Sequence, residues 1–107
     1  MAEATLIEIF GAGATQTATS ITILKASLPT LTPIATNTAE SLLAGILLQA
    51  KTTLTTTRRD SDTSQGIAIE SGYDSLAYRG ATAYYQAALS ITLQKINSST
   101  VIDADDY

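Results

Sequence analysis

Residues 37–54 constrain the fold more than any other stretch, because their pattern, start signal and length all indicate one α-helix. Apolar side chains recur there at steps of three and four, as on one face of a helix with about 3.6 residues per turn. The residues on that face are Ala39, Leu42, Leu43, Ile46, Leu47, Ala50 and Leu54. Asn37 and Glu40 have the spacing of a capping box at the helix start. We expect this face to be buried.

Three further residues widen the apolar surface of this helix. Ala44 and Leu48 lie beside the main face, and Gly45 permits a close approach of another backbone or side chain at a cost of about 1 kcal/mol relative to Ala. We interpret Ala44 and Leu48 as candidate interface residues of a helix that also packs on another subunit. The alternative is a helix that covers only its own sheet and leaves some apolar surface exposed.

The segments before this helix predict two strands joined as a hairpin. Residues 4–10 are largely apolar, and residues 19–24 alternate apolar with polar side chains. Gly11 and Gly13 between them favour a wide turn with positive φ angles. Gln16 stands where a dinucleotide-binding loop has its third glycine, and no helix follows, so such a loop is not indicated.

The connections on either side of the helix are predicted to be irregular. Two prolines favour an extended crossover over residues 28–35, with Leu31 and Ile34 pinned to the core. Residues 55–66 combine two arginines with nearby aspartates and predict a solvated loop. An anion site at the arginine pair is the alternative, whereas two carboxylates alone do not make a calcium loop.

Two more strands are predicted in the C-terminal half. The first covers residues 66–73, and the apolar positions change phase after Gly72, which indicates a bulge or bend there. Arg79 and Gly80 mark the next turn. Residues 81–96 alternate over about five repeats and predict the longest strand, in preference to a helix.

The order of these segments predicts a single α+β domain over residues 1–107, with an acidic C-terminal tail over residues 97–107. In this β-β-α-β-β order, a mainly antiparallel sheet of four to five strands is covered on one face by one amphipathic helix. The other sheet face is then either solvated or covered by another subunit. A low-charge surface rich in threonine favours contact with neighbours, although an exposed sheet face lined with threonine is the simpler alternative.

Composition excludes several classes of site. The chain has no cysteine and no histidine, so thiolate, disulfide and imidazole chemistry are absent from it. A net charge of −4 with 15% charged residues argues against nucleic-acid binding. The longest apolar run is too short to span a membrane, and no segment resembles a signal peptide, so we expect a soluble protein. The best pair of carboxylates for acid/base catalysis, Glu70 and Asp74, lies beside a bend without an evident cleft. We therefore expect that the protein is not an enzyme and that it binds no cofactor, metal or small-molecule substrate.

Four of the five tyrosines, Tyr73, Tyr78, Tyr84 and Tyr85, cluster in the last two predicted strands. Tyr84 and Tyr85 are adjacent and must point to opposite faces, so one is expected in the core and the other exposed. Exposed tyrosine often anchors protein interfaces. Tyr78, Tyr84 and Tyr107 are therefore candidate interface residues, with packing inside the same chain as the alternative for each.

These features predict a non-enzymatic structural subunit that forms a homo-oligomer or docks into a larger particle of protein partners. The composition resembles that of tailed-phage virion proteins, which are low in lysine, lack cysteine and are rich in threonine and alanine. The resemblance implies a capsid, neck or tail component, located in the virion, but it covers no specific residues. The alternative hypothesis is a small monomeric domain whose tyrosine-rich strands hold a peptide or a carbohydrate.

Overall fold

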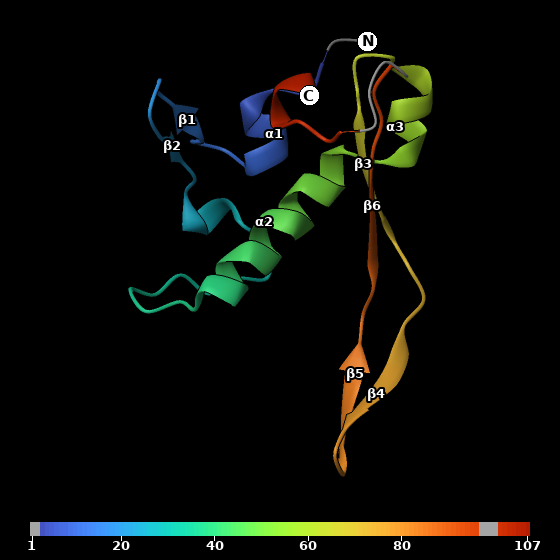
Figure 1. The fold of residues 1–107 in the computed structure, drawn as a ribbon. Helices are drawn as coiled ribbons and strands as arrows, with labels where there is room; N and C mark the ends of the chain where they lie inside the picture. Colours follow the sequence, from blue (N-terminus) through green and yellow to red (C-terminus); the bar gives the residue numbers. More distant parts are fainter. Residues whose placement is uncertain (1–2, 97–100) are drawn as a thin grey trace.

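A computed structural model describes residues 3–96 and 101–107 (Figure 1). The helices in this part of the chain are α1 (Leu6–Phe10), α2 (Ala39–Thr53) and α3 (Thr56–Ser61), with 3-10 turns η1 (Lys25–Ser27) and η2 (Ala104–Asp106). The strands are β1 (Thr15–Gln16), β2 (Ile21–Thr22), β3 (Ile67–Ser71), β4 (Ser75–Arg79), β5 (Thr82–Gln86) and β6 (Leu89–Leu93). Helices and antiparallel strands are both present, so the predicted α+β class is confirmed.

The strands pair two by two. Three antiparallel ladders, β1 with β2, β3 with β6 and β4 with β5, take the place of one sheet of four to five strands. The last two ladders follow one another along a single long hairpin (Figure 1). The N-terminal segments that were expected to extend the sheet do not reach it, because they form a helix and a separate short hairpin.

Helix α1 occupies residues that the sequence predicted as a strand. The backbone N–H of Glu8 donates to the Thr5 hydroxyl at 3.2 Å, and the Glu8 carboxylate accepts from the backbone N–H of Thr5 at 3.0 Å. This reciprocal pair is a capping box, which satisfies two of the free N–H groups at a helix start. The prediction of a strand over residues 4–10 was wrong because this local signal outweighs the apolar run.

The predicted strand over residues 19–24 is reduced to β2. The hydroxyl of Thr17 accepts hydrogen bonds from the backbone N–H groups of Thr19, at 3.3 Å, and Ser20, at 3.1 Å. Such local bonds from threonine compete with a long ladder and close a tight turn. The hairpin therefore turns at residues 17–20 rather than at Gly11 and Gly13, although both glycines do have positive φ angles.

Helix α2 confirms the central prediction of the sequence but starts differently. Thr38, not Asn37, is the N-cap residue, and its hydroxyl accepts from the backbone N–H of Ser41 at 3.1 Å. The predicted capping box between Asn37 and Glu40 is wrong, because the Asn37 side chain accepts from the backbone N–H of Ile34 at 3.0 Å. The side chain of Ile34 is 54% exposed, so its predicted core contact is also wrong.

Only part of the apolar face of α2 is buried. Ala50 and Leu54, at the C-terminal end, are 6% and 7% exposed, whereas Leu43 is 57% exposed. Gly45 is buried against Leu28, and a Cβ atom added to this glycine would lie 3.2 Å from the Cβ atom of Leu28. The predicted close approach at Gly45 is confirmed. Leu28 therefore supplies the contact between crossover and helix that was expected from Ile34.

The core lies where α2 meets β3. Ile69 is 5% exposed and packs with Ala50 and Leu54, and partly buried residues including Ile9 and Leu89 surround them. The backbone N–H of Ile69 donates to the carbonyl oxygen of Leu54 at 2.8 Å. One face of the β3–β6 ladder is thus fixed to the C-terminal end of α2.

Helix α3 covers the other face of this ladder. The sequence predicted a solvated loop over residues 55–66, but Thr55 caps a helix by accepting from the backbone N–H of Arg58 at 3.1 Å. Arg59 donates from Nη1 to the Thr92 hydroxyl of β6 at 3.0 Å, and Ala68, opposite Thr92, is 1% exposed. Strand β3 is therefore covered on both faces at Ala68 and Ile69, whereas most of β6 is exposed. The loop prediction was wrong, and the chain contains more than the single helix expected.

A bulge separates the two ladders of the long hairpin. The flanking pairs are Ser71 with Leu89 and Ser75 with Gln86. Three residues, 72–74, therefore lie opposite two, 87–88, which is the count of a β-bulge. The bulge predicted at Gly72 is confirmed, as are the turn at Gly80, where φ is +61°, and the strand character of most of residues 81–96.

Candidate interaction surface on the hairpin arm

The outer part of the hairpin, residues 72–88 including the bulge, projects away from the body of the molecule (Figure 1). We call it the hairpin arm. Every residue of β5 is exposed, and in β4 only Ala77 is partly covered. The principal extents of the molecule, 46 by 32 by 25 Å, reflect this elongated shape. The arm thus presents two sides that the described residues of the chain leave uncovered.

One side of the β4–β5 ladder in the hairpin arm is apolar apart from the tyrosine hydroxyls. Residues directly opposite in an antiparallel ladder share a face, and the ladder pairs Leu76 with Tyr85 and Tyr78 with Ala83. Leu76, Tyr78 and Tyr85 are 67%, 68% and 70% exposed. We call these four residues the apolar face of the arm. Three large side chains on it point into solvent.

The opposite side is mainly polar and consists of Ser75, Ala77, Arg79, Thr82, Tyr84 and Gln86. The Arg79 guanidinium lies 5.0 Å from the centroid of the Tyr84 ring, within range of a cation–π interaction. Tyr84 and Tyr85 do point to opposite faces. The expectation that one of them is in the core is wrong, since they are 44% and 70% exposed on an arm that no other element covers.

Tyr85 also contacts the bulge. Its hydroxyl donates a hydrogen bond to the carboxylate of Asp74, and this bond raises the pKa of Tyr85. Glu70, the other member of the carboxylate pair considered from the sequence, lies opposite Ser90 in the β3–β6 ladder. Asp74 is thus bound to Tyr85 within the arm. Neither Asp74 nor Glu70 lines the cavity described below.

The structure does not gather the five candidate interface residues into one surface. Tyr78 lies on the apolar face of the arm and Tyr84 on its polar side. On α2, Ala44 is exposed and Leu48 is half-buried beside Pro29. Tyr107 is half-buried, and its ring packs against Gly66. A Cβ atom added to Gly66 would lie 2.8 Å from the Cδ1 atom of Tyr107.

A second exposed apolar surface lies on α2. Leu43, Leu47, Ala50 and Leu54 follow the spacing i, i+4, i+7 and i+11, so they form one line along the helix. We call this line the α2 stripe. It is buried at Ala50 and Leu54, half-buried at Leu47 and exposed at Leu43. Helical periodicity identifies this face, but it does not reveal that Leu43 is exposed.

A cavity of about 470 Å³ lies at the base of the hairpin, lined in part by Arg58, Gln65 and Tyr107. Its size is in the range of ligand pockets, but Gln65, the buried polar residue at its base, is fully engaged within the chain. Gln65 accepts from Arg58 Nη1 at 2.8 Å, and its amide nitrogen donates to the backbone carbonyls of Thr55, at 3.0 Å, and Ile67, at 2.8 Å. These bonds connect α3 to β3, so we assign them a structural role.

The tail approaches the same cavity. Lys95 Nζ donates to the Asp106 carboxylate at 2.8 Å and to the carbonyl oxygen of Val101. The Tyr107 hydroxyl is buried and has no hydrogen-bond partner among the residues described. The predicted acidic tail is thus partly held against the body over residues 101–107, whereas its first residues, 97–100, lie outside the described residues.

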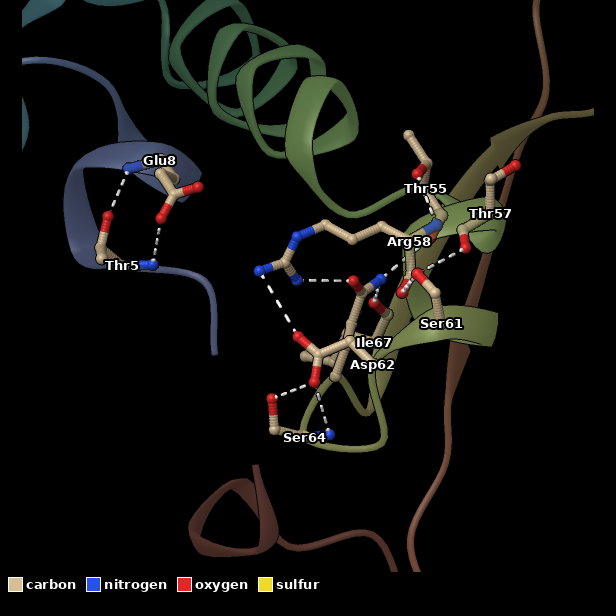
Figure 2. Close-up of polar contacts among 10 residues, drawn as sticks. Thr5, Glu8, Thr55, Thr57, Arg58, Ser61, Asp62, Ser64 and Ile67 are labelled. Atoms are coloured by element: carbon tan, nitrogen blue, oxygen red, sulfur yellow. Dashed lines mark hydrogen bonds and ion pairs between the residues drawn. The ribbon is translucent and has the colours of Figure 1, made fainter. Parts of the chain in front are cut away.

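Asp62 completes the polar cluster between α3 and β3 (Figure 2). It is only 4% exposed, and one carboxylate oxygen accepts from the backbone N–H of Ser64 at 3.0 Å and from its hydroxyl at 2.6 Å. Arg58 Nη2 lies 3.6 Å from the other oxygen. The two bonds from Ser64, with a smaller contribution from Arg58, lower the pKa of Asp62.

This lowered pKa predicts a pH dependence of stability. An acid whose pKa is lower in the folded state stabilises the fold above its unfolded pKa, and this contribution is lost as the pH falls through the folded value. Between about pH 4 and pH 2, wild type should therefore lose more unfolding free energy than Asp62→Asn, measured by urea unfolding at each pH. Asp60→Asn is the control, because the Asp60 side chain is 75% exposed and should follow wild type. Identical pH profiles for wild type and Asp62→Asn would contradict the prediction.

Within residues 3–96 and 101–107, no group of three or more Asp, Glu, His or Cys side chains is placed to hold a metal ion. No helix in those ranges combines the length and apolar character needed to cross a bilayer. No family model matches the chain, and neither the curated proteins nor the solved structures compared with it give a match. The indications of function therefore come from the surfaces of the chain itself.

Proposed function

We propose that this chain is a non-enzymatic structural subunit that joins other protein subunits through the hairpin arm. One observation carries the proposal: Leu76, Tyr78 and Tyr85 share one face of the arm and are each about two-thirds exposed. An isolated two-stranded hairpin is only marginally stable in water and gains stability by packing a hydrophobic face. A partner that covers this face would supply that packing.

The contrast between the two sides of the arm supports the proposal. A hairpin that is solvated on both sides has no need to segregate its side chains, whereas this arm places polar residues mainly on one side and apolar residues on the other. Fully burying a large apolar side chain stabilises a contact by roughly 1.5–3 kcal/mol. Tyrosine is also enriched in the buried centres of interfaces. The arm therefore has the composition of one half of an interface.

The kind of particle is proposed from composition. The chain is low in charge, lacks cysteine and carries few lysines, as expected for a phage capsid, neck or tail component, which would place it in the virion. The hairpin arm adds a means of attachment that suits any ordered assembly, and it does not distinguish a phage particle from another one.

The test is the assembly state of arm variants. We call Leu76→Asp/Tyr78→Asp the arm variant. We expect it to raise the dissociation constant of the assembly on the order of 100-fold or more relative to wild type, because buried apolar anchors dominate interfaces. Sedimentation velocity over a range of concentrations measures this. Ser75→Asp/Thr82→Asp is the matched control, since it adds the same charge to the polar side of the same ladder. Far-UV circular dichroism checks that both variants stay folded.

Two results would count against the proposal. A wild-type chain that remains monomeric at the highest attainable concentration would overturn it, as would an arm variant that assembles like wild type. A monomer would favour the alternative, a binding domain for a peptide or carbohydrate, because Tyr78 and Tyr85 together offer an exposed aromatic surface. In that case Tyr78→Ala should abolish ligand binding, whereas Tyr84→Ala, on the other side of the arm, should not.

A further inference from the structure

Two uncovered apolar surfaces of this molecule begin at the same core contact. At the core, Ile69 of β3 packs with Ala50 and Leu54 of the α2 stripe. Towards the N-terminus of α2 the stripe continues through Leu47 to Leu43, which is 57% exposed. Among the described residues, the cover of the stripe is thus partial at Leu47 and least at Leu43.

The hairpin shows the same progression in the other direction. Ile69 and Ile91 are directly opposite each other and share the face that meets α2. Side chains alternate along a strand, so every second residue from Leu93 to Ala83 lies on this face. On the other strand the bulge adds one residue, and this extra residue places Leu76 and Tyr78 on the same face. Along this face Ile69 is 5% exposed, Leu89, farther out, is half-buried, and Tyr85 in the arm is 70% exposed. The apolar face of the arm is thus the outer end of the core face of the hairpin.

Within one chain, these two surfaces cannot cover each other. From their shared contact, α2 runs to one side and the arm to another, so their far ends lie apart (Figure 1). The contact at Ile69, Ala50 and Leu54 nevertheless shows how this strand face and this helix stripe pack together. A second molecule with the same arm and the same stripe offers the complementary half of each.

From these surfaces we infer that the partner of the arm is a second copy of this chain, and that the apolar face of the arm packs on the N-terminal half of the α2 stripe of that copy. The inference rests on the proposed function and names its partner and its contact surface. One type of contact then covers both exposed surfaces. Pairing of two arms face to face would leave Leu43 uncovered in both copies.

The large apolar side chains form the centre of such a contact and supply part of its area. A stable interface takes roughly 800 Å² from each partner, and a tyrosine side chain can bury on the order of 150–250 Å². Tyr78, Tyr85 and Leu76 on the arm, together with Leu43 and Leu47 on the helix, supply five large side chains to it. Because arm and stripe are different surfaces, the contact closes either reciprocally in a dimer or head to tail in a ring or filament.

The experiment is a mixing test between two defective variants. The arm variant keeps an intact stripe, and Leu43→Asp, called the stripe variant, keeps an intact arm. We expect each alone to be monomeric at a concentration where wild type is assembled. A one-to-one mixture should form a complex of two chains, because the arm of one variant meets the stripe of the other. Sedimentation velocity and native mass spectrometry measure the complex, and we expect its dissociation constant to be at least tenfold lower than that of either variant alone.

Ala44→Asp is the matched control for the stripe variant, since it adds the same charge to the neighbouring exposed position off the stripe, and it should assemble like wild type. A stripe variant that assembles like wild type would overturn the inference while leaving the role of the arm intact. Loss of assembly in Ala44→Asp but not in Leu43→Asp would overturn it too, by placing the contact on the Ala44 and Leu48 side of α2. So would a mixture of folded variants that stays monomeric. A monomeric wild type, by contrast, would remove the proposed function itself.

Discussion

Replacing Ile69 with alanine should lower the free energy of unfolding by about 2–5 kcal/mol, the usual loss for deleting a large buried aliphatic side chain. Ile69 is 5% exposed and stands at the centre of the contact between α2 and β3. The buried hydrophobic residues described in the body are few, and domains of this size are stable by only about 5–15 kcal/mol. Guanidinium unfolding measures the loss, best in the arm variant, so that assembly does not contribute to the stability.

The matched control is Ile91→Ala, the same substitution in the residue directly across the ladder. Ile91 is 43% exposed, so less apolar surface is lost and a smaller cavity is left. We expect its effect to be less than half that of Ile69→Ala. Equal losses would show that the face of the hairpin is buried to the same depth at both positions, contrary to the structure.

Replacing Gly11 with alanine should be the next most damaging change. Gly11 has φ +99° and ψ 166°, a region open essentially to glycine alone, in which another residue costs on the order of 1–3 kcal/mol. An added Cβ atom would also lie 2.7 Å from the Cβ atom of Ser27. The change would disturb the end of α1 and the hydrogen bond from the Ser27 hydroxyl to the carbonyl oxygen of Ala12. Thermal and guanidinium unfolding both measure the expected loss.

Gly80→Ala is the matched control, because Gly80 also has a positive φ angle but has no neighbour corresponding to Ser27. Gly80 has φ +61° at the tip of the arm, and an added Cβ atom would meet nothing within 4 Å. Its backbone cost is confined to a tip that can open locally, so global unfolding should change little. If Gly80→Ala destabilised the protein as much as Gly11→Ala, the close approach of Ser27 to Gly11 would not be the cause.

Long periodic segments were predictable from the sequence. Helix α2 follows from the spacing of its leucines, and the bulge at Gly72 follows from the change of phase between Ile69 and Leu76. The short N-terminal elements were not. Residues 4–10 are too few to show a period, so their structure depends on two side-chain hydrogen bonds between Thr5 and Glu8.

Threonine has a role in the structure that its frequency does not reveal. Its branched Cβ atom suits a pleated surface, which is the basis for expecting it on an exposed sheet face. In the structure Thr5, Thr38 and Thr55 each cap an α-helix by accepting a hydrogen bond from the backbone N–H three residues on. A capping hydroxyl and a strand hydroxyl look alike in composition. Only the position before an incipient helix distinguishes them.

The candidate surface was predictable in part. Alternation placed Tyr84 and Tyr85 on opposite faces, and Tyr78 was singled out, but the sequence could not show that the hairpin extends beyond the body. Exposure of Tyr85 and Leu76 depends on where the helices end relative to the strands, which is set by tertiary packing around Ile69. Leu43 illustrates the same limit, since its helical face was identified and its exposure was not.

The bulge also divides the chain according to which substitutions it tolerates. All of the described buried residues lie outside residues 72–88, so changes in the arm escape the packing constraints that act on the body. Charge, length and side-chain size in β4 and β5 can therefore vary without loss of the folded core. The partner preference of such a subunit can diverge, or be redesigned, independently of its stability.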